Sequence, residues 1–114
     1  MLTKEQIEAS ADWIASHQSA EGALPWWRGG KLDPWDHVHS AMGLTVAGRI
    51  DEAKHAYRYL EATQTAAGGW YAWREDGKVT NRTQETNHAA YPATGIWQLY
   101  LATSDEAFLA EMWP

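Results

Sequence analysis

Acidic and imidazole side chains gather at the starts of two predicted helices. Asp36 and Glu85 occupy comparable places in the first turns, and His39 follows Asp36 by one turn. Two carboxyl groups that flank a sugar permit acid and base catalysis of glycoside hydrolysis, and a hydrogen bond between Asp36 and His39 would orient the imidazole. Asp36 could instead only interact favourably with the positive end of the helix dipole, and Glu85 could be a solvated acid in the first turn. Asp36, Glu85 and His39 are the candidate catalytic residues.

Aromatic and polar side chains close to these acids are candidates for binding a ligand. The chain has 8 tryptophans in 114 residues, and most of them fall in or beside predicted loops. Large amphipathic rings can line a cavity or seal a helical hairpin, and both interpretations stay open. The candidate ligand-binding residues are Trp27, Trp35, His37, Trp70, Trp73, Arg82, Asn87, His88 and Tyr91.

Several kinds of chemistry and partner are not indicated. The chain has no cysteine, and His37 and His39 are two residues apart, so a helix would splay them; we expect no metal and no cofactor. The formal charge is −6 and the basic residues are scattered, which argues against nucleic acid. No signal peptide or membrane span is apparent, so we expect a soluble, cytoplasmic protein.

Helical periodicity and capping signals dominate the chain. We predict helices over residues 3–17, 33–48, 51–63, 84–102 and 105–112. Thr3 opens a capping box, Asp33 with Pro34 begins the second helix, and Ser104 would cap the last. Pro92 should kink the fourth helix. The polar loop over residues 74–83 could form a small hairpin around Asp76-Gly77.

The sequence also repeats internally. Residues 13–27 match residues 59–73, with Gln18 over Gln64, Gly22 over Gly68 and Trp27 over Trp73. Residues 43–53 match residues 97–107 less closely. We therefore predict one domain over residues 1–114, with hairpin units over about 3–49 and 51–103 and the start of a third over 104–114. Such units cannot bury their apolar faces alone and must stack.

The repeat resembles known helical toroids. Residues 64–70 read QTAAGGW, which has the Q-x-x-x-G-x-W form of the repeat in terpenoid cyclases and prenyltransferase-repeat proteins, and residues 18–26 are a looser copy. Residues 100–114 are similar to a helix junction of six-hairpin glycosidases. Both resemblances imply an (α/α)6 toroid, but they imply different chemistry. The D-x-D-D motif of the cyclases and the zinc ligands of the protein prenyltransferases are absent from this sequence.

These observations predict an all-α partial toroid of about two hairpins plus a short helix. Three chains would close a twelve-helix ring, so we expect a homotrimer. The starts of its inner helices would then face the mouth of an aromatic, acid-lined central cavity. The first functional interpretation is binding of an apolar or isoprenoid ligand in that cavity. The alternatives are glycosidase-like binding or hydrolysis of a saccharide, and a minimal or engineered assembly without catalysis.

Overall fold

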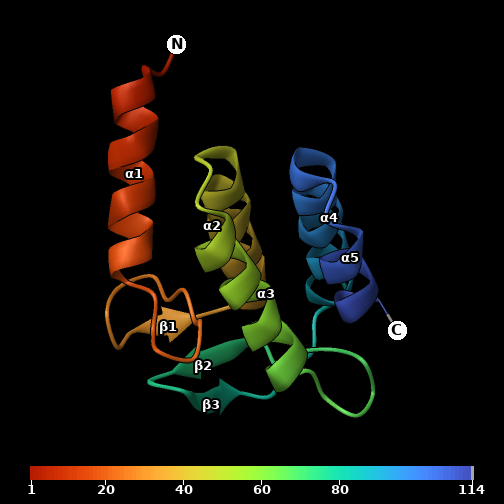
Figure 1. Cartoon of the computed structure of the whole chain (residues 1–114). Coiled ribbons are helices and arrows are strands. Elements are labelled where there is room, and N and C mark those ends of the chain that lie inside the picture. The colour runs from red at the N-terminus through yellow and green to blue at the C-terminus, as the bar shows by residue number, and fades with distance from the viewer. Residues whose placement is uncertain (114) are drawn as a thin grey trace.

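A computed structural model describes residues 1–113, which form five helices and a small sheet (Figure 1). The helices are α1 (Lys4–Ser16), α2 (Pro34–Val46), α3 (Ile50–Thr63), α4 (Thr86–Thr103) and α5 (Glu106–Met112). The strands are β1 (Lys31–Leu32), β2 (Trp73–Glu75) and β3 (Lys78–Asn81). All five predicted helices are present, with ends that differ from the predicted ones by at most about two residues. Pro114, the last residue of the predicted third unit, lies outside the described residues.

Two helix starts have the predicted caps. The Thr3 hydroxyl accepts a hydrogen bond from the Gln6 N–H at 3.2 Å, and the Gln6 side chain accepts one from the Thr3 N–H at 2.9 Å, which completes the capping box of α1. Asp33 accepts from the Asp36 N–H at 3.0 Å, with Pro34 at the first helical position of α2. These caps satisfy N–H groups that have no partner within the helix.

The cap of α5 differs from the prediction. Asp105, rather than Ser104, accepts a hydrogen bond from the Phe108 N–H, at 2.9 Å. Ser104 instead ends α4 in the left-handed conformation, with φ of 55°. The prediction was wrong because Ser104 terminates α4, and the next residue, Asp105, is the one in position to cap α5.

The all-α prediction is wrong in one respect, because three short antiparallel strands form a sheet in the order β1-β2-β3. The expected hairpin at Asp76-Gly77 is present, and both turn residues have positive φ, 46° and 74°. That conformation matches the twist of a two-residue hairpin. β1 adds to this hairpin by pairing Lys31 with Glu75 and Leu32 with Arg74. A strand of two residues is too short to show a periodicity, so β1 could not be predicted from the sequence.

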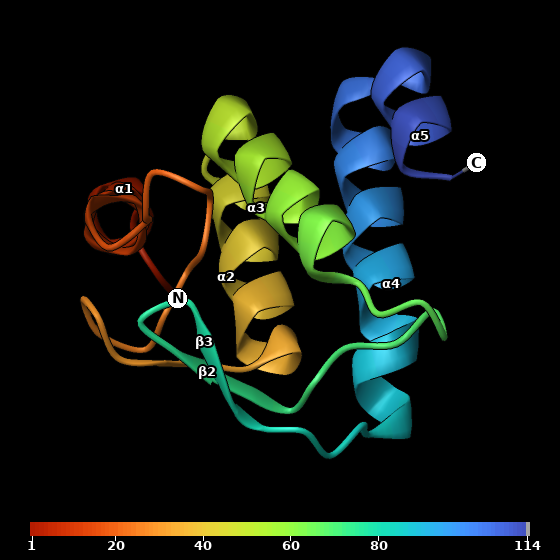
Figure 2. The ribbon, with the colours of Figure 1, turned by 90° about the horizontal axis from the view of Figure 1, so that it is seen from below.

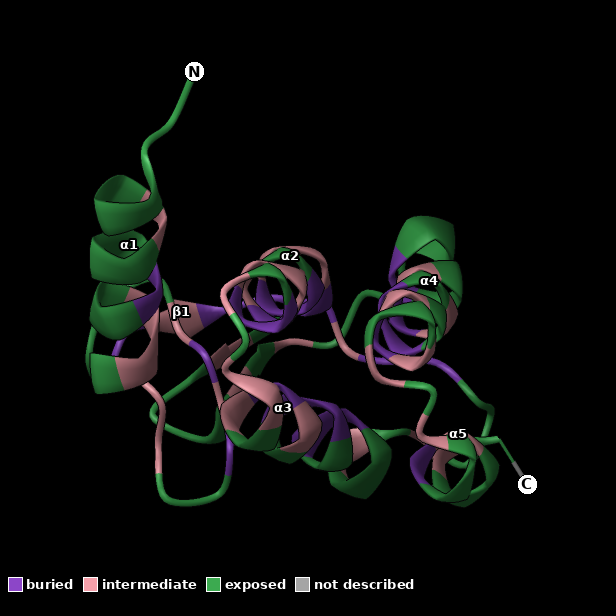
Figure 3. Ribbon diagram, turned by 45° about the horizontal axis from the view of Figure 1, so that its top comes forward, coloured by how far each residue is buried: buried purple, intermediate pink, exposed green. Residues whose placement is uncertain are grey.

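Helices α2 and α4 lie side by side and run in the same direction. Trp35 stacks on Tyr91, and one turn further a Cβ added at Gly95 would lie 2.9 Å from Val38 Cγ1. Both helices therefore begin at the same end of the molecule, near the sheet (Figure 2). Helices α3 and α5 form a second layer, and α1 packs beside α2 (Figure 3). This arrangement places the predicted site segments together; closure of a ring and a trimer stay predictions.

The core lies between the two helical layers. Apolar side chains that are almost fully buried come from every helix, and they are Ala11, Val38, Ala41, Leu44, Ala53, Ala56, Tyr57, Leu60, Ile96, Leu99 and Phe108. Salt bridges from Lys54 to Asp105 and from Arg58 to Glu111 hold α5 against α3. Within residues 1–113, no helix has both the length and the apolar character needed to cross a bilayer.

Candidate functional site

Two similar turns connect the layers and position the site segments. The Gln18 side chain donates to the Gly22 carbonyl at 3.3 Å, and Gln64 donates to the Gly68 carbonyl at 2.8 Å. Both glycines have positive φ, 98° and 84°. At Gly22 a side chain would also collide with His55, whose carbonyl oxygen lies 2.4 Å from the position of an added Cβ. The repeated glutamine and glycine are therefore explained by the same turn geometry.

One group of candidate residues meets between α2 and α4. Trp35 stacks on Tyr91 with ring centroids 4.1 Å apart and planes 18° apart. The Tyr91 hydroxyl lies 2.8 Å from His39 Nε2, so tyrosine and imidazole share a hydrogen bond. Together with Asp36, whose carboxyl senses the charge of His39, these residues are named the α2–α4 cluster. It combines a half-buried aromatic stack, an imidazole and a carboxyl near two helix starts.

The pKa of Asp36 is raised above its usual value of 3.8. Partial burial is the main cause, followed by the charge of Asp33 and a hydrogen bond with Asp33. The Trp26 side chain, as a hydrogen-bond donor, and the charge of His39 act in the opposite direction. A carboxyl with a raised pKa keeps its proton at a higher pH, which is the property required of a general acid.

Glu85, the second candidate acid, precedes α4 at the same end of the fold. It occupies the N-cap position without a capping hydrogen bond from its side chain. Its carboxylate lies 3.8 Å from His88 Nε2, and His88 is 4 % exposed with no partner for Nδ1 among residues 1–113. Asn87 is exposed in the first turn of α4. These side chains stand on the helix that carries Tyr91.

The remaining loop candidates lie around the sheet. Trp27 and Trp73 are exposed, and the Trp27 indole covers Gly30 so closely that an added Cβ would be 2.2 Å from the ring. Trp73 begins β2 and lies against the amino group of Lys31. Arg82 packs over the ring of Tyr71 and donates to its hydroxyl at 3.3 Å. The sheet thus brings Trp73 close to the segment before α2, whereas Arg82 lies with Tyr71.

Two of the predicted ligand-binding residues have structural partners. His37 is fully buried, accepts from the Leu24 N–H at 3.1 Å, and has Nε2 2.8 Å from the Ala56 carbonyl. Trp70 is 8 % exposed and donates its indole N–H to the Leu60 carbonyl at 2.7 Å. The bonds of His37 link the loop before α2 to α3, and the bond of Trp70 holds the loop after α3 against the same helix. Both side chains thus have structural roles, and ligand binding by His37 and Trp70 stays a prediction.

Trp70→Phe is expected to lower the free energy of unfolding by about 1 kcal/mol, because the Leu60 carbonyl loses a buried hydrogen-bond donor. Chemical denaturation monitored by circular dichroism measures this loss. Trp97→Phe, at an indole that is 52 % exposed on α4, is the matched control and should have almost no effect. Equal losses in the two variants would contradict the structural role of the Trp70 indole.

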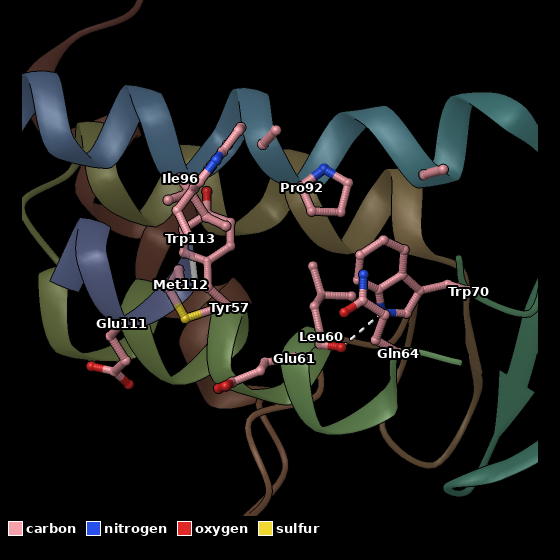
Figure 4. A pocket seen from close by; sticks show the side chains of 12 residues that line it. Tyr57, Leu60, Glu61, Gln64, Trp70, Pro92, Ile96, Glu111, Met112 and Trp113 are labelled. Atoms are coloured by element: carbon pink, nitrogen blue, oxygen red, sulfur yellow. Dashed lines mark hydrogen bonds between the residues drawn. The ribbon is translucent and has the colours of Figure 1, made fainter. Parts of the chain in front are cut away.

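Two pockets lie outside the α2–α4 cluster. The first has a volume of about 290 Å³ between α3, α4 and α5, and Figure 4 shows Trp70, Leu60 and Pro92 at one end of it. The second has a volume of about 560 Å³ and is lined by residues of the first turn, the β1–β2 region and α3. Trp70 is the only candidate residue among the lining residues of the two. Across residues 1–113, no group of three or more acidic or histidine side chains is placed to hold a metal.

Two residues next to the cluster were not predicted. The amino group of Lys31 lies 4.0 Å from the ring centroids of both Trp26 and Trp73. The neighbouring Trp26-Trp27 pair was a visible signal for an aromatic surface. No local signal could identify Lys31, because its contact with Trp73 depends on the pairing of β1 with β2.

An aromatic face beside a carboxyl with a raised pKa is a suitable arrangement for binding and cleaving glycosides. No protein-family model matches the chain. The chain is 44% identical, over all of its 114 residues, to the MMP endo-(1,4)-3-O-methyl-alpha-D-mannosidase of Mycolicibacterium hassiacum. It spans 32% of the length of that enzyme. The similarity favours the glycosidase-like alternative, and the prenyltransferase-like interpretation receives no support from it.

Proposed function

We propose that this chain is a glycosidase-like module that binds a mannose-containing saccharide at the α2–α4 cluster. The observation that carries the proposal is the 44% identity over the whole chain to an enzyme named as an endo-mannosidase. The matched region is about a third of that enzyme, so the proposal concerns the part of a saccharide site that these residues supply.

The α2–α4 cluster has the groups that such a ligand requires. The apolar faces of sugar rings pack well on aromatic side chains, and the stacked rings of Trp35 and Tyr91 offer a rigid surface with few rotatable bonds. The shared hydrogen bond of His39 and Tyr91 leaves polar atoms at the edge of this surface. Sugar hydroxyls would bind at that edge.

Asp36 is the acid in the proposed hydrolysis. Its raised pKa suits donation of a proton to the glycosidic oxygen. Hydrolysis needs a second carboxylate to activate water or attack the sugar. Glu85 is the candidate for this role, because α2 and α4 are parallel and begin at the same end of the molecule (Figure 2).

Calorimetric titration with a 1,4-linked oligosaccharide of 3-O-methyl-α-mannose tests the binding. Tyr91→Ala is expected to weaken binding by about tenfold, because it removes half of the aromatic stack. Trp97→Ala, two turns further along α4, is the control and should bind normally. A folded wild-type chain that binds an isoprenoid diphosphate instead of this saccharide would overturn the proposal and return the prenyltransferase-like interpretation.

Hydrolysis is measured by the reducing ends released in the same mixtures. Asp36→Asn is expected to lower the rate by about a hundredfold, as for the loss of a general acid, and to retain binding. Unchanged release of reducing ends in Asp36→Asn would remove Asp36 from the proposed chemistry.

We also propose that copies of the chain associate into the predicted ring. Support comes from large apolar side chains that are exposed towards the ends of α2 and α4, where Val46 is 67 % and Leu101 65 % exposed. Light scattering that shows a compact folded monomer would exclude this assembly.

A further inference from the structure

The larger of the two pockets lies apart from the α2–α4 cluster. Its volume of about 560 Å³ is within the range of small-molecule sites. Its walls come from the loop after α1, from β1 with the turn of the β2–β3 hairpin, and from the second half of α3, which lie at one end of the fold (Figure 1). We name it the polar pocket, after the side chains of Glu21, Arg28, Tyr59, Arg74 and Asp76 that line it.

Two arginines of the polar pocket are fixed by backbone groups. Arg28 donates to the Ser16 carbonyl at 2.6 Å, and Arg74 donates to the Gly77 carbonyl at 3.2 Å. Neither arginine forms an ion pair with a carboxylate of residues 1–113. A guanidinium group has five N–H donors. Each arginine is therefore held in place and keeps donors that the fold does not use.

Tyr59 supplies a hydroxyl group that also lacks a partner. The residue is 8 % exposed, and its ring packs beside that of His37, with centroids 5.4 Å apart. Its hydroxyl makes no hydrogen bond within residues 1–113, yet it is not one of the fully enclosed atoms without a partner. The hydroxyl therefore keeps accessible surface, and the polar pocket is the cavity that Tyr59 lines. Because buried tyrosine hydroxyls usually have a partner, this one is open to a ligand.

The balance of charge in the polar pocket selects the kind of ligand. Glu21 and Asp76 would repel an anion, and the two arginines would repel a cation. A neutral hydroxyl group both donates and accepts, so a ligand with several hydroxyls can bind the acidic and the basic groups together. Pro25 and Leu32 add apolar surface to the wall, which suits the C–H face of a sugar ring.

We propose that the polar pocket is a second saccharide site, in which Arg28, Tyr59 and Arg74 bind the hydroxyl groups of a neutral sugar chain. The site is separate from the α2–α4 cluster, because no residue of the cluster lines it. The inference rests on the proposed function for the class of ligand only. Two sites on one module would hold a polysaccharide at more than one point, which slows its escape.

NMR titration of the wild-type chain with a 1,4-linked oligosaccharide of 3-O-methyl-α-mannose tests the proposal. The Nε–H resonances of Arg28 and Arg74 should shift to saturation, and they should still do so in Tyr91→Ala, which weakens binding at the α2–α4 cluster. Tyr59→Phe is expected to weaken the titration of these resonances by about fivefold, as for the loss of one hydrogen bond. Tyr100→Phe removes a hydroxyl from α4 outside the pocket, so this matched control should keep the wild-type affinity.

The resonances of the two sites separate the possible failures. A saccharide that shifts His39 and Tyr91 but neither arginine would overturn the second site and leave the proposed function intact. Inorganic phosphate that shifts both arginines, where the saccharide does not, would also overturn it and identify an anion site. Arginine shifts without a response at His39 and Tyr91 would support the second site and contradict the proposed role of the cluster. The wild-type titration decides these outcomes even if Tyr59→Phe does not fold.

Discussion

His37→Ala will lower the free energy of unfolding by about 4 kcal/mol. The imidazole is fully buried and connects two segments, since it accepts from the Leu24 N–H and meets the Ala56 carbonyl of α3. Alanine would leave a cavity and a buried N–H without a partner. Both effects destabilise the folded chain, because nothing else in the core can move to fill a ring-sized space without cost.

The same residue is expected to make stability depend on pH. Burial lowers the pKa of His37 from 6.5 to about 4 in the folded chain. Between these values the unfolded chain binds a proton at His37 that the folded chain does not bind. The free energy of unfolding therefore falls as the pH decreases from 6.5 to about 4, by about 3 kcal/mol, and this contribution is complete above pH 6.5.

Denaturation in urea at several pH values measures both effects. His37→Gln keeps one acceptor and one donor but does not titrate, so its stability relative to wild type should improve as the pH falls. His55→Gln, at an exposed position on α3, is the matched control and should keep the pH dependence of wild type. The difference in free energy of unfolding between wild type and His37→Gln should therefore change between pH 7 and pH 4. An equal difference at the two pH values would contradict a buried, neutral imidazole.

Gly95→Ala is the second large expected effect, with a loss of about 3 kcal/mol. Gly95 lies where α4 crosses the layer of α2 and α3. An added Cβ would be 2.5 Å from the Tyr57 hydroxyl oxygen and 2.9 Å from both Tyr57 Cε1 and Val38 Cγ1. Tyr57 and Val38 are fully buried, so relief of these contacts requires movement within a close-packed core.

Gly43→Ala, in the parallel helix α2, is the matched control. An added Cβ there would meet only Ile14 Cδ1, at 3.8 Å, which is an ordinary contact. Alanine should therefore stabilise α2 by about 1 kcal/mol through its helix propensity. The same substitution is thus expected to have opposite signs in the two helices, and thermal and urea denaturation of both variants will show this. Equal effects would contradict the close approach at Gly95.

Tyr57→Phe provides a further check on Gly95→Ala. The Tyr57 hydroxyl is buried and has no hydrogen-bond partner among residues 1–113, so its removal should cost little. It is also the atom closest to the added Cβ. The double variant should therefore recover part of the stability lost in Gly95→Ala. A double variant that is less stable than Gly95→Ala would place the steric conflict elsewhere.

Helix positions and the repeated turns were predictable because local chemistry decides them. The capping box at Thr3 and the Asp33 cap depend on contacts within a few residues, and the structure confirms both. The match of Gln18 with Gln64 reflects a side chain that bonds to a carbonyl four residues later in each copy. Interactions of such short range can be recognised in a sequence.

The site was predictable only in part. The repeat suggested that the starts of α2 and α4 lie together, and Trp35, His39 and Tyr91 do meet between these helices. The sequence could not distinguish these side chains from His37 and Trp70, whose buried hydrogen bonds are made to distant backbone groups. Aromatic residues of the same types occur in the candidate site and in structural positions. The partner of each ring depends on how the layers pack, so residue type alone does not separate the two.

By itself, the sequence determined five helices, the caps of α1 and α2, a repeated turn and a concentration of aromatic and acidic residues near two helix starts. Only the tertiary structure decided that α2 and α4 run parallel, that β1 joins the hairpin of β2 and β3, and that Lys31 lies between two tryptophans. The physical reason is the range of the interactions. Caps and turns are local, whereas burial, strand pairing and the environment of Asp36 depend on residues that only the folded chain brings together.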